Sequence, residues 1–341
     1  GVMNNSGSSA NLLAIAALSN LNSSPNLQPG DEVIVPALSW STTIWPLIQH
    51  GLIPVIVDID IETFNIDPNE ITKAISDKTK AIMPVHVYGN PCKMDSIIDI
   101  CKNYDLILIE DCCEALGASY RNVPVGSFGD IATFSFYFSH HMTTMEGGIC
   151  ITNKDDLAER MRILRAHGWV REVNNPKTFT DRYPDIDPRF LFVDTGYNLR
   201  VTELQGAFGS VQLPKLESYV EARRENTKDW NKKLHRFSEF FDFQKETKNA
   251  KSSCFGYTLI CKSEKGINRE DIREFLSENG IETRPIICGN IARQPAMRDY
   301  QHRVVGELEK SNLIMDNAFS FGNHQALNQE ARDYLVEIIE R

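Results

Sequence analysis

The sequence of 341 residues contains no apolar run approaching the length of about 20 residues that a membrane-spanning helix needs. It also lacks an excess of positive charge. The formal net charge of -10 argues against general nucleic-acid binding, which needs clustered Lys and Arg. No basic segment precedes the apolar run Leu12–Leu18, so we interpret this run as a buried helix and not as a signal peptide. These absences favour a cytoplasmic protein with neither membrane nor nucleic-acid partners.

None of the eight cysteines forms a pair with zinc-finger spacing, and no repeat of fixed period is present. A chain of this length does not need disulfides to stabilise its core, so we expect reduced and mostly buried thiols. The adjacent His140 and His141 are compatible with a metal, but no HExxH-type spacing accompanies them. We therefore predict no metal site.

The first half of the chain alternates short apolar strands with helical patterns. Strands are predicted at residues 32–36, 54–58, 80–85, 106–110, 131–136 and 148–152, and helices at 45–50, 69–76 and 94–102. Apolar strands separated by helices are typical of a mainly parallel sheet that is covered on both faces. Ligands of such sheets bind at the carboxyl ends of the strands.

The second half has a different pattern. Longer helices are predicted at 154–167 and 201–226, the second of them kinked or divided at Pro214. A strand at 254–261 and helices at 268–279 and 328–341 follow. We therefore predict a large domain over residues 1–225 and a smaller C-terminal α/β domain over 226–341. The first nine residues resemble a functional loop with no element before it, so we expect a further N-terminal segment to precede them.

Two short segments have the composition of a ligand site. Small residues at 6–9 precede the first apolar helix, where backbone amides and the helix dipole favour an anion. A simple helix N-cap explains the same residues equally well. The apolar strand at 106–110 ends in Glu110 and Asp111. One buried carboxylate there could keep a ring nitrogen protonated, or it could cap the turn that follows.

A third segment, residues 133–148, ends a strand in His140 and His141 and continues through two threonines to Glu146 and a glycine pair. Histidine titrates near neutrality and suits proton transfer. A pair of surface histidines with no function is the alternative.

Together and in this order, the three segments resemble the sugar aminotransferase and dehydratase family of the fold-type I pyridoxal-phosphate (PLP) enzymes. The resemblance runs from Gly7 nearly to the end of the chain, with further support at residues 84–89, 196–203 and 280–285. It implies an α/β fold like that of aspartate aminotransferase and a homodimer with shared active sites.

In most of this family a lysine holds the cofactor covalently, six residues before the Glu of the Glu-Gly-Gly motif. This chain has His140 there, and no lysine occurs between Lys102 and Lys154. The resemblance therefore implies a non-covalent cofactor, as PLP or pyridoxamine phosphate (PMP), because only an amine can hold it covalently. Histidine at this position resembles the 3-dehydratase branch. That branch removes the C3 hydroxyl of a nucleotide-linked 4-keto-6-deoxy sugar, for which we expect GDP-4-keto-6-deoxymannose, while L-glutamate regenerates PMP and ammonia is released.

The resemblance also implies roles for individual residues. They are catalysis at His140 and Asp111; cofactor contacts at Gly7, Ser8, Ser9, Trp40, Asp111, Glu114, Ser135 and Asn198; and sugar contacts at His167, Arg171 and Arg284. Asp111 is implied as the partner of the ring nitrogen and Trp40 as the residue stacked on the ring, although Trp40 could equally be a core residue. Asn198 is implied to reach the phosphate of the neighbouring subunit. The role of Glu114 stays open, because the family usually has an amide or aspartate there.

Three alternatives remain. An ordinary aminotransferase of nucleotide sugars is disfavoured by the missing lysine. A CDP-4-keto-6-deoxyglucose 3-dehydratase would share the histidine but needs cysteines for a [2Fe-2S] cluster, and none lies between Cys150 and Cys254. A non-catalytic cofactor-binding protein is weakened by the retained Asp111 and Ser135.

Overall fold

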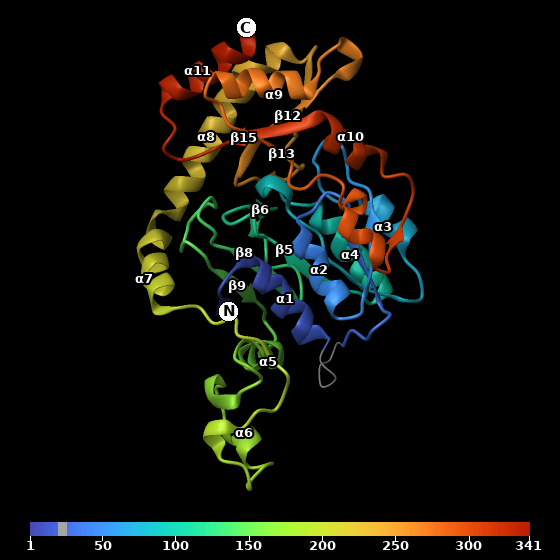
Figure 1. The fold of residues 1–341 in the computed structure, drawn as a ribbon, viewed down its shortest axis with the longest axis vertical. Coiled ribbons are helices and arrows are strands. Elements are labelled where there is room, and N and C mark those ends of the chain that lie inside the picture. Colours follow the sequence, from blue (N-terminus) through green and yellow to red (C-terminus); the bar gives the residue numbers. More distant parts are fainter. Residues whose placement is uncertain (20–25) are drawn as a thin grey trace.

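An eight-stranded sheet forms the centre of the computed structural model, which describes residues 1–19 and 26–341 (Figure 1). The strands lie in the order β1-β9-β8-β5-β4-β2-β3-β14. Their bounds, in that order, are Val2–Asn4, Gly148–Ile151, Ile131–Ser135, Ile107–Asp111, Thr79–Ile82, Glu32–Pro36, Ile53–Val57 and Arg303–Val304. Neighbours from β8 to β14 pair in parallel, whereas β9 is antiparallel to both β8 and β1. The prediction of a mainly parallel central sheet is confirmed.

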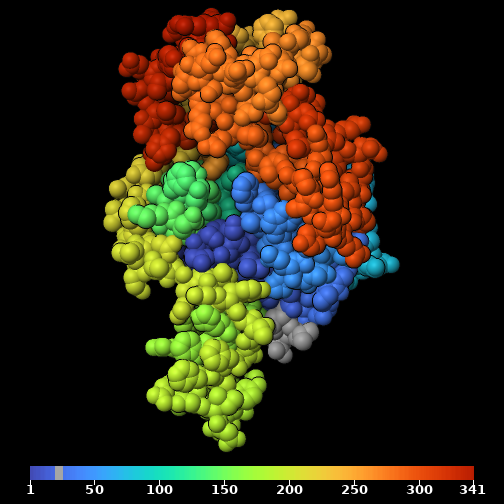
Figure 2. All heavy atoms as spheres, in the orientation of Figure 1, coloured from blue at the N-terminus to red at the C-terminus, as the bar shows by residue number. Residues whose placement is uncertain are grey.

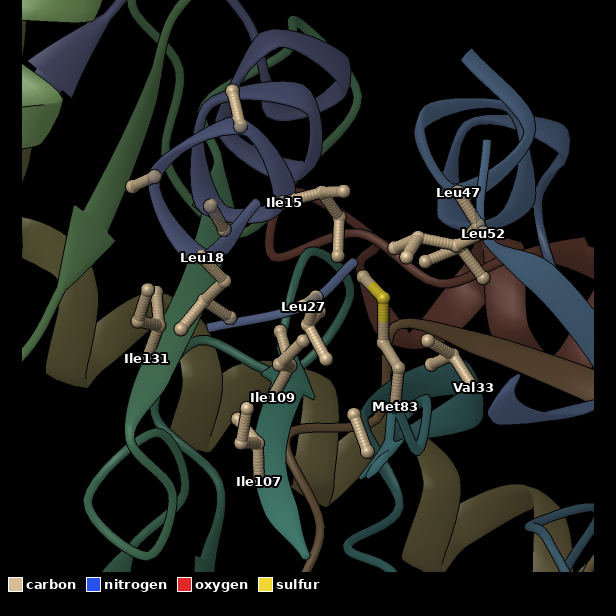
Figure 3. Close-up of a cluster of buried hydrophobic side chains, with 14 of the residues drawn as sticks. Ile15, Leu18, Leu27, Val33, Leu47, Leu52, Met83, Ile107, Ile109 and Ile131 are labelled. Carbon is tan, nitrogen blue, oxygen red and sulfur yellow. The ribbon is translucent and has the colours of Figure 1, made fainter. Parts of the chain in front are cut away.

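Helices cover both faces of this sheet, because alternate strand residues point to opposite sides. They are α1 (Gly7–Leu18), α2 (Ser41–Gln49) and α5 (Asp155–Arg165) on one face, and α3 (Pro68–Ala74) and α4 (Met94–Tyr104) on the other. Val33 of β2 packs with the first group of helices, whereas Ile34, the next residue, packs with the second. In Figure 3, Ile15 and Leu18 of α1 lie over strand residues such as Ile109.

A smaller antiparallel sheet lies at the other end of the molecule, at the top of Figure 1. Its strands are, in spatial order, β10 (Phe241–Phe243), β12 (Gly256–Cys261), β15 (Ala318–Gly322) and β13 (Thr283–Pro285). The helices of this region are α8 (Leu216–Leu234), α9 (Arg269–Glu278), α10 (Glu309–Asn317) and α11 (Gln329–Glu340). Side chains of α8, α9 and α11 form one buried cluster with this sheet. The expected smaller C-terminal α/β unit is therefore present.

The long helix expected at 201–226 is divided at Pro214, as predicted. It consists of α7 (Glu203–Gln212), a short turn of 3-10 helix and α8, because proline lacks the amide that would continue the hydrogen bonds. In Figure 1, α8 runs along one side of the molecule up to the small sheet. The predicted domain boundary at residue 225 falls inside α8, which is continuous there. In addition, β14, at residues 303–304 of the predicted C-terminal domain, pairs with β3 of the large sheet. The division at residue 225 stays a prediction.

Two differences from the expected elements have simple causes. Helix α2 begins at Ser41 and not at residue 45, because its polar first turn, Ser-Thr-Thr, does not show in a search for apolar periodicity. Strands β1 and β14 contain only three and two residues, too few to show any periodicity. Since β1 precedes the loop before α1, the expectation that no element precedes this loop was wrong.

Two further features complete the fold. A three-stranded sheet joins β11 (Ala250–Lys251), β6 (Ser119–Tyr120) and β7 (Val123–Pro124). The segment between α5 and α7, which contains the short helix α6 (Lys177–Thr180), projects from the body of the molecule at the bottom of Figures 1 and 2. Among the described residues, no helix has both the length and the apolar character needed to cross a membrane.

Candidate active site

A cavity of about 360 Å³ lies where β5 and β8 end and α1 begins. Its lining includes seven of the residues proposed from the sequence: Gly7, Ser8, Trp40, Asp111, Glu114, Ser135 and His140. It also includes Ser6, Asn11, Thr42, Val85, Cys113, Tyr137, Ser139, Glu146 and Ile287. The fold thus brings three separate sequence motifs together at the strand ends, where parallel sheets bind their ligands.

The Asp111 carboxylate is only 3% exposed and is held by three donors. Its Oδ2 accepts hydrogen bonds from Asn11 Nδ2 at 2.9 Å and Thr43 Oγ1 at 2.8 Å, and its Oδ1 accepts one from the Cys113 amide at 3.1 Å. Asn11 is itself oriented by Thr133 Oγ1, which donates to its Oδ1 at 2.6 Å. A carboxylate has about four acceptor sites, so Oδ1 retains capacity for one further donor from the cavity.

The first turn of α1 lies against the end of β8. A Cβ atom on Gly7 would lie 2.5 Å from the Ser135 Cβ, so only glycine allows this approach. Ser6 is the N-cap, and its Oγ accepts the Ser9 amide and donates to the Ser9 hydroxyl. No described residue accepts a hydrogen bond from the Gly7 or Ser8 amide. These two amides can therefore bind an anion, whereas Ser9 belongs to the cap and does not line the cavity.

Trp40 precedes α2 and lines the cavity with 55% of its surface exposed, so it is not a core residue. An exposed indole at a cavity wall offers a flat face on which an aromatic ring can stack.

His140 lies in the loop between β8 and β9 and also lines the cavity. Its ring packs edge-to-face on Phe255, with a centroid distance of 5.0 Å, and lies 6.0 Å from the Tyr137 ring. Burial, with the nearby Arg223 guanidinium, lowers the pKa of His140 to about 4. The expectation that this histidine titrates near neutrality was wrong, because the folded chain buries the ring. The ring is therefore uncharged at neutral pH and able to accept a proton.

Glu114 is the second acidic side chain in the cavity wall, and its environment differs from that of Asp111. It accepts one hydrogen bond, from the Tyr88 amide to Oε2 at 2.8 Å. Burial raises the pKa of Glu114 to about 7, with a further contribution from the Asp111 charge, although the Tyr88 hydrogen bond opposes both. The Glu114 carboxyl group therefore tends to carry a proton in the folded chain.

Four other residues proposed from the sequence do not line this cavity. They are Asn198, His167, Arg171 and Arg284, all exposed on the described chain. Arg171 lies over the Trp169 ring at 5.1 Å, and Arg284 pairs with Glu282. Their roles stay predictions.

Several residues that shape the site were not found from the sequence. Asn11, a single amide in an otherwise small or apolar helix, was a signal that could have been used. Thr43, Arg223 and Phe255 gave no such signal, because each meets the site through contacts between segments far apart in the chain.

A buried cluster behind the site, His86, Glu110 and Cys112, has the composition of a metal site, but hydrogen bonds explain it. His86 Nδ1 accepts the Cys92 amide at 2.9 Å, so its Nε2 carries the proton and donates to Glu110 Oε2 at 3.3 Å. Glu110 also accepts three backbone amides between residues 126 and 129. These hydrogen bonds connect β5, the strand that ends in Asp111, with the loop that precedes β8.

The fold and this cavity define an α/β enzyme of the PLP-dependent fold-type I class. The chain belongs to the DegT/DnrJ/EryC1/StrS aminotransferase family, which it matches over residues 1–340.

Two curated relatives share one name. The chain is 40% identical to the GDP-4-keto-6-deoxy-D-mannose 3-dehydratase of Escherichia coli O55:H7, over 99% of this chain and 87% of that protein. It is 42% identical to the enzyme of the same name from Yersinia pseudotuberculosis, over 100% of this chain and 86% of that protein. A crystal structure of GDP-4-keto-6-deoxymannose 3-dehydratase with a trapped PLP–glutamate geminal diamine has a TM-score of 0.91 and 39% identity, over 99% of this chain and 87% of that chain.

The residues present fit the cofactor of this class. The free amides of Gly7 and Ser8 suit a phosphate, the Trp40 indole suits an aromatic ring, and the remaining acceptor site of Asp111 suits a protonated ring nitrogen. No lysine is among the described residues that line the cavity, so these side chains offer no amine for covalent attachment.

Proposed function

We propose that this protein is a PMP-dependent 3-dehydratase that removes the C3 hydroxyl of a nucleotide-linked 4-keto-6-deoxy sugar, specifically GDP-4-keto-6-deoxymannose. The observation that carries this proposal is His140, an uncharged histidine in the cavity at the position where an aminotransferase of this family has its lysine. The two dehydratases at 40% and 42% identity support the same reaction and the same sugar nucleotide.

When bound, the cofactor supplies an amine that condenses with the C4 ketone of the sugar and a ring that accepts electrons. Asp111 keeps the ring nitrogen protonated, because its carboxylate is held in place by Asn11, Thr43 and the Cys113 amide. The amides of Gly7 and Ser8 bind the phosphate at the positive end of α1.

His140 moves the proton. Its Nδ1 is buried, and none of the described residues is within hydrogen-bonding distance of it, so Nε2 is the atom that exchanges a proton with the reacting molecule. The uncharged ring would accept at Nε2 a proton from the amine-bearing carbon of the cofactor and return it to the departing C3 hydroxyl, which would leave as water. Because the pKa of His140 is about 4, the proton-accepting form is present throughout the physiological range.

The proposed reaction is balanced by glutamate. The sugar is reduced by two electrons as it exchanges its C3 hydroxyl for hydrogen. Glutamate is oxidised to 2-oxoglutarate, and its nitrogen leaves as ammonia. The PLP–glutamate adduct of the similar crystal structure supports glutamate as the amino donor.

The proposed enzyme is a cytoplasmic homodimer in which Asn198 contacts the cofactor phosphate of the neighbouring subunit. Two observations support a partner subunit. Asn198 is exposed and does not line the cavity of its own chain. Helix α7, which follows it, buries no residue and exposes Leu204, Phe208 and Val211. An apolar helix face of this kind is typical of protein–protein contacts.

The test is product identification. The purified protein is incubated with PLP, glutamate and either GDP-4-keto-6-deoxymannose or CDP-4-keto-6-deoxyglucose, and the products are analysed by mass spectrometry. We expect a 3-deoxy-4-keto sugar from the GDP substrate without added iron or reductase. An amino sugar in its place would show that the protein is an aminotransferase, and turnover of the CDP sugar alone would reassign the substrate.

A further inference from the structure

Arg223 of α8 is a buried cation without a carboxylate partner among the described residues. Its side chain is 1% exposed and donates to three backbone carbonyls: Phe255 O at 2.9 Å, Asn323 O, and His140 O at 3.4 Å. Buried guanidinium groups normally pair with carboxylates, because an uncompensated buried charge is costly. A charge held in this way next to the reacting histidine calls for an explanation.

The carbonyls that Arg223 binds belong to three segments that meet behind His140. One is the loop that carries His140 itself, and another ends in Phe255, whose ring packs on His140. The third follows β15 at Asn323, whose Nδ2 donates back to the Arg223 carbonyl at 3.0 Å and to Cys254 O at 2.9 Å. Arg223 therefore fixes both the backbone of His140 and the ring against which His140 packs.

The adjacent residue strengthens this arrangement. His141 is fully buried, and its Nε2 lies 3.0 Å from the Ser253 carbonyl, to which it donates. Burial and Arg223 lower the pKa of His141 well below its ordinary value, so both histidines of the pair are uncharged beside the guanidinium.

The charged and titratable groups around His140 oppose one another. They are Tyr137, His141 and Glu146 on its own loop; Asp111, Cys113 and Glu114 in the cavity wall; Arg223 and Arg224 on α8; and Cys254 and His324 on the neighbouring segments. The carboxylates would favour a protonated imidazole, and the guanidinium of Arg223 disfavours it. Arg223 donates to the His140 carbonyl oxygen and has no carboxylate partner among the described residues, so no paired charge cancels its field at His140.

We propose that Arg223 is a positioning residue for His140: it clamps the three segments that hold the imidazole and keeps that ring in its uncharged, proton-accepting form. This inference rests on the proposed function, in which His140 transfers the proton. It also explains why Arg223 has no carboxylate partner among the described residues, because such a partner would cancel the charge that acts on His140.

The test measures the charge of His140 directly in the purified protein, with and without PMP. The chain contains eight histidines, so selective 13C labelling of their rings gives few NMR signals, and the His140 signal is the one lost in His140→Asn. In the wild type we expect His140 to stay uncharged from pH 8 to pH 5. A wild-type midpoint near 6.5 overturns the proposal without any further variant.

The decisive variant is Arg223→Gln, which removes the charge and keeps an amide donor. We expect the His140 midpoint to rise by about one pH unit. Arg223→Met provides a second neutral side chain in case the glutamine variant does not fold, and Arg223→Lys, which keeps the charge, should leave the midpoint within about half a unit of wild type. The matched control is Arg224→Gln, because Arg224 donates to Ser252 O and Gly117 O and makes no contact with His140.

The proposal is supported if the His140 midpoint rises in the neutral Arg223 variants and stays unchanged in Arg223→Lys and Arg224→Gln. The acidic limb of the kcat–pH profile should move in the same direction. An unchanged His140 midpoint in a folded neutral variant overturns the proposal, because burial alone then explains the uncharged ring. The two proposals fail separately: an amino sugar product contradicts the dehydratase but leaves the NMR result intact.

Discussion

The two walls of the cavity are held in different ways. The strand-end wall, which contains Asp111, Ser135 and Gly7, is made by β5, β8 and the start of α1. The histidine wall, which contains His140, is held by α8 and by the segment that precedes β12. Arg223 and Phe255 lie 83 and 115 residues after His140, and both belong to segments that also support the small sheet.

This difference separates the two tasks of the site. In the proposed mechanism the strand-end wall binds and orients the cofactor, and its residues lie at the ends of strands in the packed central sheet. In the proposed mechanism the histidine wall moves a proton, and its geometry depends on elements that also carry the small C-terminal sheet.

The largest expected effect breaks the strand-end wall. Asp111→Asn should lower kcat by on the order of 100-fold or more, because a neutral amide cannot keep the ring nitrogen protonated. The fold should persist, since Asn can still accept from Asn11 or Thr43, although one donor would then face its amide group. Steady-state kinetics measures kcat, and circular dichroism shows whether the fold persists. Turnover equal to that of the wild type would remove Asp111 from the mechanism.

Next in size is a change to the histidine wall. His140→Lys should replace proton transfer by covalent capture of the cofactor, because it restores an amine at this position. We expect loss of dehydration and a new absorbance band that borohydride converts to a stable adduct. His140→Gln, which has no amine, is the matched control. A lysine variant without any borohydride-stable cofactor would mean that residue 140 does not face the reacting carbon of the cofactor.

A third experiment asks whether the strand-end wall is completed by a partner subunit. Asn198→Asp and His140→Ala should each be inactive alone, because one repels the phosphate and the other lacks the base. If Asn198 acts across the interface, a mixed dimer carries both defects in one site and leaves the other intact. Subunit exchange should then restore up to about a quarter of wild-type activity. No recovery after verified exchange would place Asn198 in its own subunit's site or outside the site.

The smallest expected effect concerns the Glu114 carboxyl group. The pKa of Glu114 is raised by burial to about 7, so the folded state favours the protonated form, and stability is lost as pH rises from about 4.5 through 7. Glu114→Gln removes this loss and can still accept the Tyr88 amide. Its melting temperature should exceed that of the wild type by roughly 2 °C at pH 8.5 and by less at pH 5. An equal difference at both pH values would contradict the raised pKa.

Gly7, Asp111 and Ser135 of the strand-end wall could be predicted from the sequence, because each belongs to a short motif at the end of a strand or the start of a helix. Asn11 and Thr43, which hold Asp111, were missed. The histidine wall could be predicted only in part. His140 itself was found, but its partners Arg223 and Phe255 are distant in the chain, and no local pattern marks them. Its lowered pKa depends on burial, which only the folded chain defines. In the fold, the short β1 and β14 were missed because two or three residues carry no periodicity.

The proposal that this enzyme removes the C3 hydroxyl and does not transfer an amine is tested most directly by following the nitrogen of glutamate. Ammonia and 2-oxoglutarate are measured together during turnover of GDP-4-keto-6-deoxymannose with 15N-labelled glutamate. The dehydratase predicts one labelled ammonia for each 2-oxoglutarate and no label in the sugar. Label in the sugar, without release of ammonia, would contradict the proposal.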